Sequence, residues 1–223
     1  MRRVTLTFDN GPTPGITDHV LDVLGRYGVN ASFFLVGTQL MSVEGRVLAE
    51  RAHAEGHWIG NHTLSHGAPL GEQNDMDAPE REIGGMHALL GPLAHESRFF
   101  RPNGRGRLGP HVLSQHACDY LVAHRATLVM WTHIPRDRVG AVGDWVVDAQ
   151  HASSESDWPL LVLHDRPSGH DVPGGSMSQL HRYLEWALES GIQFTQEFAE
   201  SCVPILRGEA RMSLDPYVQR AVA

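Results

Sequence analysis

Short runs of apolar and β-branched residues alternate along the chain with longer segments in which apolar residues recur at helical spacing. Short apolar runs bounded by Gly, Pro, Asn or Asp are typical of buried strands, and the longer periodic segments are typical of helices. We expect strands at residues 4–8, 31–37, 57–62, 97–106 (running into a Gly-rich loop), 119–123, 127–131, 159–165 and 192–195. We expect helices at residues 16–27, 39–55, 77–90, 110–117, 140–151 and 176–190.

The predicted strands and helices alternate about seven times, which indicates βα crossovers and a mainly parallel sheet or barrel. The chain of 223 residues is long enough for one domain with a buried core. No internal repeat, linker or low-complexity segment divides it. We therefore expect one α/β domain over residues 1–207, followed by a weakly patterned C-terminal tail over residues 208–223.

Composition narrows the class of protein. A hydrophobic content of 41% and a charged content of 20% are ordinary for a globular chain, and the net charge of -8 counts against nucleic acid or an anionic membrane as partner. No run approaches the ~20 apolar residues of a membrane span, and the N-terminal apolar run is too short for a signal peptide. We expect a cytoplasmic protein without membrane insertion, and free thiols at Cys118 and Cys202.

Polar side chains gather where the predicted strands end. Asp9 and Asn10 end the first strand, and His62, Arg101 and His164 end three later ones. The carboxyl ends of the strands share one face of a βα barrel, so we expect these side chains to meet there. Each of them alone is explained more simply as a turn residue, a solvated charge or a core histidine. Their coincidence indicates an active site.

His62 and His66 lie four positions apart. On a helical turn this spacing would place both imidazoles on one side, where they can bind a single metal ion. Two surface histidines are the alternative interpretation, since the chain contains 15 His. A zinc site needs a third protein ligand, which Asp9 or Asn10 could supply.

Taken in order, these segments resemble the motifs of the polysaccharide deacetylase family, the carbohydrate esterases with a NodB-homology domain. The resemblance extends from about residue 3 to residue 205. The family sequence TFDDGP reads TFDNGP here, which implies a general base at Asp9 and a metal ligand at Asn10. The pattern H-S/T-x-x-H implies metal binding by His62 and His66, with Thr63 shaping the loop. The family implies a distorted (β/α)7 barrel, and an open flavodoxin-like sheet is the alternative.

The next family motifs supply residues that position the catalytic groups. The segment FRPNG implies that Arg101 orients the base and that a backbone N–H of Asn103 or Gly104 contributes to an oxyanion hole. The segment WTHIPRDR implies that Asp137 orients the catalytic histidine. Asp144, which precedes a Trp, is an alternative match for that role.

The last family motif implies that His164 is the general acid. Val162 stands where the family has a Leu lining the acetyl pocket, Arg138 replaces a Trp, and Trp131 is retained beside the substrate. These departures imply a substrate other than a chitin-like chain, and a cytoplasmic location favours a small molecule or an oligosaccharide. Asn10 is neutral where the family has a carboxylate, so we expect weaker metal binding.

The resemblance implies a hydrolase that removes N-acetyl groups from a sugar or oligosaccharide with water activated by a divalent metal, expected to be zinc. Two other functions fit parts of the pattern. Relatives of this fold hydrolyse cyclic amides such as allantoin, some without metal, and the neutral Asn10 would suit such an enzyme. A degenerate homologue could also bind carbohydrate without turnover. Release of acetate or of ammonia separates the three.

Overall fold

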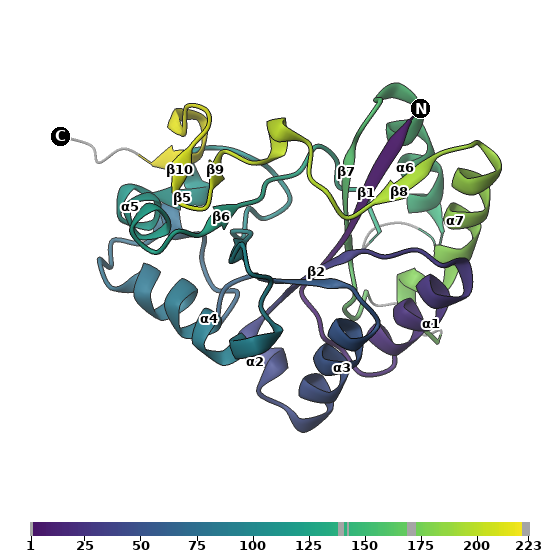
Figure 1. Cartoon of the computed structure of the whole chain (residues 1–223), viewed down its shortest axis with the longest axis horizontal. Helices are drawn as coiled ribbons and strands as arrows, with labels where there is room; N and C mark the ends of the chain where they lie inside the picture. Colours follow the sequence, from purple (N-terminus) through teal and green to yellow (C-terminus); the bar gives the residue numbers. More distant parts are fainter. Residues whose placement is uncertain (1, 138–140, 142, 169–172, 220–223) are drawn as a thin grey trace.

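The computed structural model describes residues 2–137, 141, 143–168 and 173–219. A central sheet runs through the molecule and the helices surround it (Figure 1). The main sheet has the order β10-β9-β6-β4-β3-β2-β1-β7, with β8 also paired to β1. Its strands are β1 (Arg3–Asp9), β2 (Ser32–Leu35), β3 (Trp58–Asn61), β4 (Phe99–Phe100), β6 (Thr127–Leu128), β7 (Leu160–His164), β8 (Gln193–Thr195), β9 (Ile205–Leu206) and β10 (Glu209–Ala210).

Helices connect most of the parallel strands, as a chain of βα units requires. Within the described residues, β1 to β4 and β6 to β8 pair in parallel, whereas β9 and β10 are antiparallel. A second small sheet pairs β5 (Leu113–Ser114) with β11 (Val218–Gln219). The helices are α1 (Thr17–Tyr27), α2 (Gly37–Leu40), α3 (Val43–Ala54), α4 (Gly85–Leu90), α5 (Gln115–Ala123), α6 (Asp144–Glu155) and α7 (Leu180–Glu189).

A short segment after β6, residues 129–133, closes the sheet; we call it the closing segment. β6 pairs with β4 on one side, and His133 forms a parallel bridge with Leu161 of β7 on the other. The Val162 N–H donates to the His133 carbonyl at 3.0 Å, and the His133 N–H donates to the Leu160 carbonyl at 3.2 Å. The closing segment therefore connects β6, at one end of the row of parallel strands, with β7 at the other end. The predicted distorted barrel is confirmed, and the open flavodoxin-like sheet is not found.

Burial on both faces explains the continuous apolar runs of the central strands. Every residue of β2 is buried, and the rings of Phe8 and Phe33 on neighbouring strands stack with centroids 5.1 Å apart. Helix α1 covers this region with Val20, Leu21, Val23 and Leu24, all fully buried. Each such side chain contributes roughly 1.5–3 kcal/mol when it is removed from water. The strands that carry the site are therefore held in a rigid core.

The helix expected at residues 110–117 is found only in part, and the strand expected at 119–123 is wrong. The structure has a short 3-10 helix at Pro110–Val112, β5 at residues 113–114 and a single helix, α5, over Gln115–Ala123. The Ser114 hydroxyl accepts a hydrogen bond from the Ala117 N–H at 3.2 Å and so caps this helix. The apolar residues at 120–123 are compatible with either structure, and the cap upstream favours the helix.

The other predicted helices differ from the observed ones mainly in where they begin and end. The segment 39–55 divides into α2 and α3, because the Ser42 hydroxyl accepts from the Gly45 N–H and begins a new helix. The segment 77–90 opens with a π-helical turn, Glu80–Gly84, before α4. Helix α6 runs over Asp144–Glu155 and so extends beyond the predicted end at residue 151, whereas residues 140 and 142 of the predicted segment lie outside the described residues.

Several predictions about the whole chain can be compared with this fold. The structure confirms that Cys118 and Cys202 are free, and both are buried. Among the described residues, no helix has both the length and the apolar character needed to cross a membrane. The domain boundary at residue 207 stays a prediction; beyond it, β10 pairs with β9 and β11 pairs with β5.

Candidate active site

A cavity of about 290 Å³ opens at the carboxyl ends of β1, β3 and β7 and is completed by the loops that follow β4 and β6. The structure brings all but one of the predicted site residues to its wall. The exception is Arg101, which is buried behind the wall and contacts it through Asp9. The predicted residues that line the cavity are Asp9, Asn10, His62, His66, Asn103, Gly104, Trp131, Asp137, Val162 and His164.

Asp9 is held in place by a buried arginine. One Arg101 nitrogen, Nη1, donates to Asp9 Oδ1 at 2.8 Å and to the Thr7 hydroxyl at 2.8 Å, and the guanidinium carbon lies 3.9 Å from the centre of the Phe34 ring. Burial lowers the pKa of Arg101, and Asp9 opposes that shift. A buried charge of this kind is tolerated only with a partner, so Arg101 fixes one oxygen of Asp9. The other oxygen, Oδ2, lies 3.7 Å from His62 Nε2.

Asn10 follows β1 with a φ of 80°, a left-handed conformation that Asn adopts more readily than most residues. Its side chain is buried, and Nδ2 has no hydrogen-bond partner among the described residues. The two ends of an amide have nearly the same shape, so either nitrogen or oxygen can be directed at the cavity. A buried amide without a partner suits a ligand that the protein itself does not provide.

The two histidines come from a loop after β3 and not from the helical turn considered above. Thr63 and His66 have φ values of 69° and 52°, which fold residues 62–66 back on themselves. The Asn61 side chain accepts from the Thr63 N–H at 2.8 Å, and the Thr63 hydroxyl accepts from the His66 N–H at 2.9 Å. The ring centroids of His62 and His66 lie 5.0 Å apart. Loop geometry, rather than helical spacing, brings the rings together.

Both imidazoles are in the form that binds metal. A carbonyl can only accept, so His62 Nδ1 donates to the Arg101 carbonyl at 2.8 Å and leaves Nε2 as the unprotonated nitrogen. Burial lowers the pKa of His62. Burial, and next the neighbouring His62, lower the pKa of His66 to about 3. Both rings are therefore neutral at neutral pH.

His164 ends β7 and is paired with Asp137. Its Nδ1 lies 2.9 Å from Asp137 Oδ1, and its backbone N–H donates to Asp137 Oδ2 at 2.7 Å. The alternative partner, Asp144, accepts instead from the Ala141 N–H at 2.8 Å at the start of α6. The structure thus places Asp137, not Asp144, against the histidine. Arg138 lies outside the described residues.

The loop after β4 forms one wall of the cavity. The Asn103 amide donates to the Gly67 carbonyl at 2.8 Å, and its oxygen accepts from the Arg105 N–H at 3.0 Å. A Cβ on Gly104 would lie 2.7 Å from the Trp131 ring, so only glycine fits there. This close approach holds the backbone of the loop against Trp131, and Val162 is buried in β7 on the same cavity.

Asp165 is the supporting residue whose role the sequence did not reveal. It is fully buried, accepts from the Gly11 N–H at 2.9 Å and accepts from the Thr17 hydroxyl at 2.6 Å. Burial raises its pKa to about 7. A Cβ on Gly11 would lie 2.0 Å from Asp165 Oδ2, which explains the glycine beside Asn10. The available signal was an acidic residue directly after His164 at a strand end.

Whether a metal ion fits in this cavity depends on which side chains can act as its ligands. Within the described parts of the chain, no three His, Cys, Asp or Glu side chains are arranged to hold a metal ion. A metal in this cavity therefore needs the amide of Asn10 in addition to His62 and His66. The unpartnered buried amide and the two neutral imidazoles fit such an ion, although the set carries less charge than one with a carboxylate.

The chain is similar to proteins that are described as deacetylases of carbohydrates. The family model described as polysaccharide deacetylase matches residues 1–104. A chitooligosaccharide deacetylase of Rhizobium leguminosarum bv. trifolii is 32% identical over 164 residues, which cover 74% of this chain and 72% of that protein. A peptidoglycan-N-acetylglucosamine deacetylase of Bacillus cereus is 29% identical over 192 residues, covering 86% of this chain and 84% of the relative.

Solved structures share the fold. A family 4 acetyl xylan esterase from Clostridium thermocellum, in complex with a cobalt ion, superposes with a TM-score of 0.69 at 24% identity and covers 87% of each chain. At that identity the likeness speaks for the barrel and not for the chemistry.

Proposed function

The chain belongs to the polysaccharide deacetylase family, and from this premise we propose that it removes an N-acetyl group from a sugar or oligosaccharide with the aid of a divalent metal. One observation carries the proposal. Asp9 and His164 are register partners on the neighbouring strands β1 and β7, and each has its own ionisable partner, the Arg101 guanidinium for Asp9 and the Asp137 carboxylate for His164. The cavity thus contains a carboxylate held by a cation and an imidazole held by a carboxylate, the pair that amide hydrolysis requires.

Asp9 is the general base of the proposed reaction. Arg101 occupies one carboxylate oxygen and leaves Oδ2 to take a proton from the attacking water. The rigid attachment of Arg101 to Thr7 fixes the direction of this oxygen. A base positioned in this way lowers the barrier because the proton leaves as the carbon–oxygen bond forms.

His164 is the general acid. An amine leaves slowly unless it is protonated, so the C–N bond breaks when the imidazolium gives a proton to the nitrogen. Asp137 accepts from Nδ1 and thereby keeps Nε2 as the atom that transfers the proton. It also stabilises the imidazolium before the transfer.

The remaining wall residues bind the acetyl group. A backbone N–H of Asn103 or Gly104 is the proposed donor to the oxyanion, and Trp131 with Val162 borders the space for the methyl group. A divalent ion held by Asn10, His62 and His66 would supply Lewis-acid catalysis and a water of lowered pKa. Two imidazoles with an amide oxygen suit zinc, which we propose as the metal.

The decisive test replaces the base and keeps the metal ligands. We expect Asp9→Asn to lower kcat by about 10²- to 10⁴-fold, because the water loses its proton acceptor, while metal content stays unchanged. Acetate release is measured on a panel of N-acetylated sugars, with metal per chain determined by elemental mass spectrometry. His62→Ala is the matched variant, which should lose the metal. Substantial turnover by Asp9→Asn, or release of ammonia in place of acetate, contradicts the proposal.

A further inference from the structure

A second cavity, of about 410 Å³, adjoins the active-site cavity. The two cavities share the lining residues Asn10 and His66. The second cavity is built from the loop after β1, the segment around α2, the loop after β3 and the chain that follows β7. Its other polar lining residues are Thr13, Thr38, Gln39, Ser65 and Arg166.

Among the described residues that line this second cavity, Arg166 is the one that carries a permanent charge. Arg166 contributes a guanidinium, and no Asp or Glu is among the described residues that line the cavity. The two arginines on the wall of the active-site cavity form exposed ion pairs, Arg105 with Glu72 at 2.8 Å and Arg136 with Asp148 at 3.6 Å. A guanidinium beside the active-site cavity of a chain with net charge -8 is a local feature that does not follow from composition.

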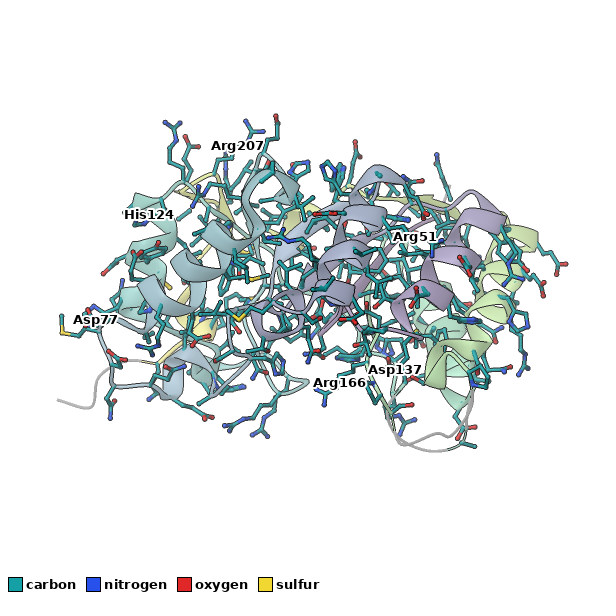
Figure 2. The ribbon with its side chains drawn as sticks, turned by 90° about the horizontal axis from the view of Figure 1, so that it is seen from below. Arg51, Asp77, His124, Asp137, Arg166 and Arg207 are labelled. Atoms are coloured by element: carbon teal, nitrogen blue, oxygen red, sulfur yellow. The ribbon has the colours of Figure 1, made fainter. Side chains whose placement is uncertain are left out.

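The backbone of Arg166 is firmly placed. The preceding residue, Asp165, is fully buried and bonded to Gly11 and Thr17, which ties the end of β7 to the loop after β1. The Arg166 side chain is half-buried and lies on the same side of the molecule as Asp137 in the view of Figure 2. It already has an interaction within the protein. A guanidinium carries five N–H donors, so it can keep this interaction and still bind a ligand.

We infer that this cavity binds an anionic substituent of the substrate, a phosphate or a carboxylate, with Arg166 as its main contact. The inference rests on the proposed deacetylation, since the shared lining residues Asn10 and His66 put this cavity next to the one that would hold the acetamide. A guanidinium matches the geometry of phosphate and carboxylate with paired hydrogen bonds. The hydroxyls of Thr13 and Thr38 and the amide of Gln39 offer further donors. The enzyme therefore prefers charged N-acetyl sugars over neutral ones.

The test compares three substrates on the full chain: neutral N-acetylglucosamine, N-acetylglucosamine 6-phosphate and N-acetylmuramic acid, which carries a carboxylate. For each we measure kcat/KM and form the ratio of the anionic to the neutral sugar. We expect Arg166→Gln to lower this ratio about tenfold, as loss of a charge-assisted hydrogen bond implies. Arg166→Lys, which keeps the charge, should retain part of it. Arg26→Gln, an exposed arginine near the end of α1, is the matched control and should keep the ratio.

The outcomes separate this inference from the proposed reaction. The anion whose ratio falls in Arg166→Gln identifies phosphate or carboxylate as the group bound. An equal ratio in the wild type and in Arg166→Gln for both anions overturns the inference, even if neutral sugars are deacetylated. Binding of N-acetylglucosamine 6-phosphate is measured in parallel by calorimetry. Binding that depends on Arg166 without release of acetate supports the anion site and contradicts the deacetylation.

Discussion

Asp137 contacts His164 through both of its carboxylate oxygens, one to the ring and one to the backbone N–H. This double contact fixes the side chain and the main chain of the histidine together. The sequence favoured Asp137 for this role, because Pro135 and Arg136 precede it, and left Asp144, which precedes a Trp, as an alternative. The structure decides between them, since Asp144 is used at the start of α6.

Removing the charge of Asp137 tests this pairing. We expect Asp137→Asn to lower kcat by roughly 10²- to 10⁴-fold, because the imidazolium loses the anion that stabilises and orients it. The pH–rate profile should change in the limb that reports His164. Asp144→Asn is the matched control, with activity close to that of the wild type. If the two variants lose activity equally, the assignment of Asp137 is wrong.

The sequence indicated the residues that line the cavity better than it indicated the buried residues that hold them in place. The residues at the wall follow strand ends and repeat a family pattern, so they were visible in one dimension. Asp165 was not assigned a role, because its partners Gly11 and Thr17 are distant in sequence. Phe34 was likewise seen only as a core residue, although it stacks against Arg101.

At the element scale, the structure differs from prediction where a short segment suits two conformations. Helix α5 was divided between a helix and a strand because the apolar residues 120–123 near its end also suit a short strand. The capping contact of Ser114 with Ala117 resolves the ambiguity. The long buried runs at β1, β2 and β7 were predicted correctly, since continuous hydrophobicity bounded by turn residues leaves little choice.

The cap of α5 can be tested by its effect on stability. We expect Ser114→Ala to lower the free energy of unfolding by about 1 kcal/mol, because the first turn loses an acceptor for the Ala117 N–H. Ser154→Ala is the control, since Ser154 is exposed in the last turn of α6 and caps no helix start. Urea denaturation of both variants measures the difference. Equal stability of the two would show that the cap contributes nothing.

At the scale of the whole molecule, Asp165 links the end of β7 to the loop after β1 and to α1. The folded protein keeps the proton of this carboxyl group up to a pH of about 7, whereas the unfolded chain loses it near the ordinary aspartate pKa of 3.8. Unfolding therefore becomes more favourable as the pH rises between these two values. This group costs no stability below about pH 4 and costs on the order of 4 kcal/mol above about pH 7.

A neutral replacement should remove that pH dependence. We expect the free energy of unfolding of Asp165→Asn to fall less than that of the wild type between pH 4 and pH 7. The stability of the variant relative to the wild type should therefore be higher at pH 8 than at pH 4. Unfolding is followed by denaturant titration of metal-free protein at several pH values. Asp77→Asn, at an exposed position labelled in Figure 2, is the control. If the free energies of unfolding of the wild type and Asp165→Asn change in parallel with pH, the raised pKa assigned to Asp165 is wrong.

The overall barrel was predictable from the alternation of strands and helices and from the family pattern, but its closure was not. β6 has only two residues, and the bridge between His133 and Leu161 joins segments that look unrelated in sequence. Hydrogen bonds between backbone groups depend little on side-chain identity, so no residue pattern marks such a closure. The edge at which the sheet closes becomes visible only in three dimensions.

The closing segment bears on how the enzyme can be redesigned. The closing segment pairs with β7 and leads directly into Pro135 and Asp137. The same stretch of chain therefore both closes the barrel and lines the cavity. Libraries that randomise residues 131–137 for new substrates will lose folded protein together with activity. Residues 105–108 are exposed and form no strand, and Arg105 and Gly106 among them line the cavity. New substrate preferences are therefore most accessible to directed evolution there, with Gly104 left unchanged.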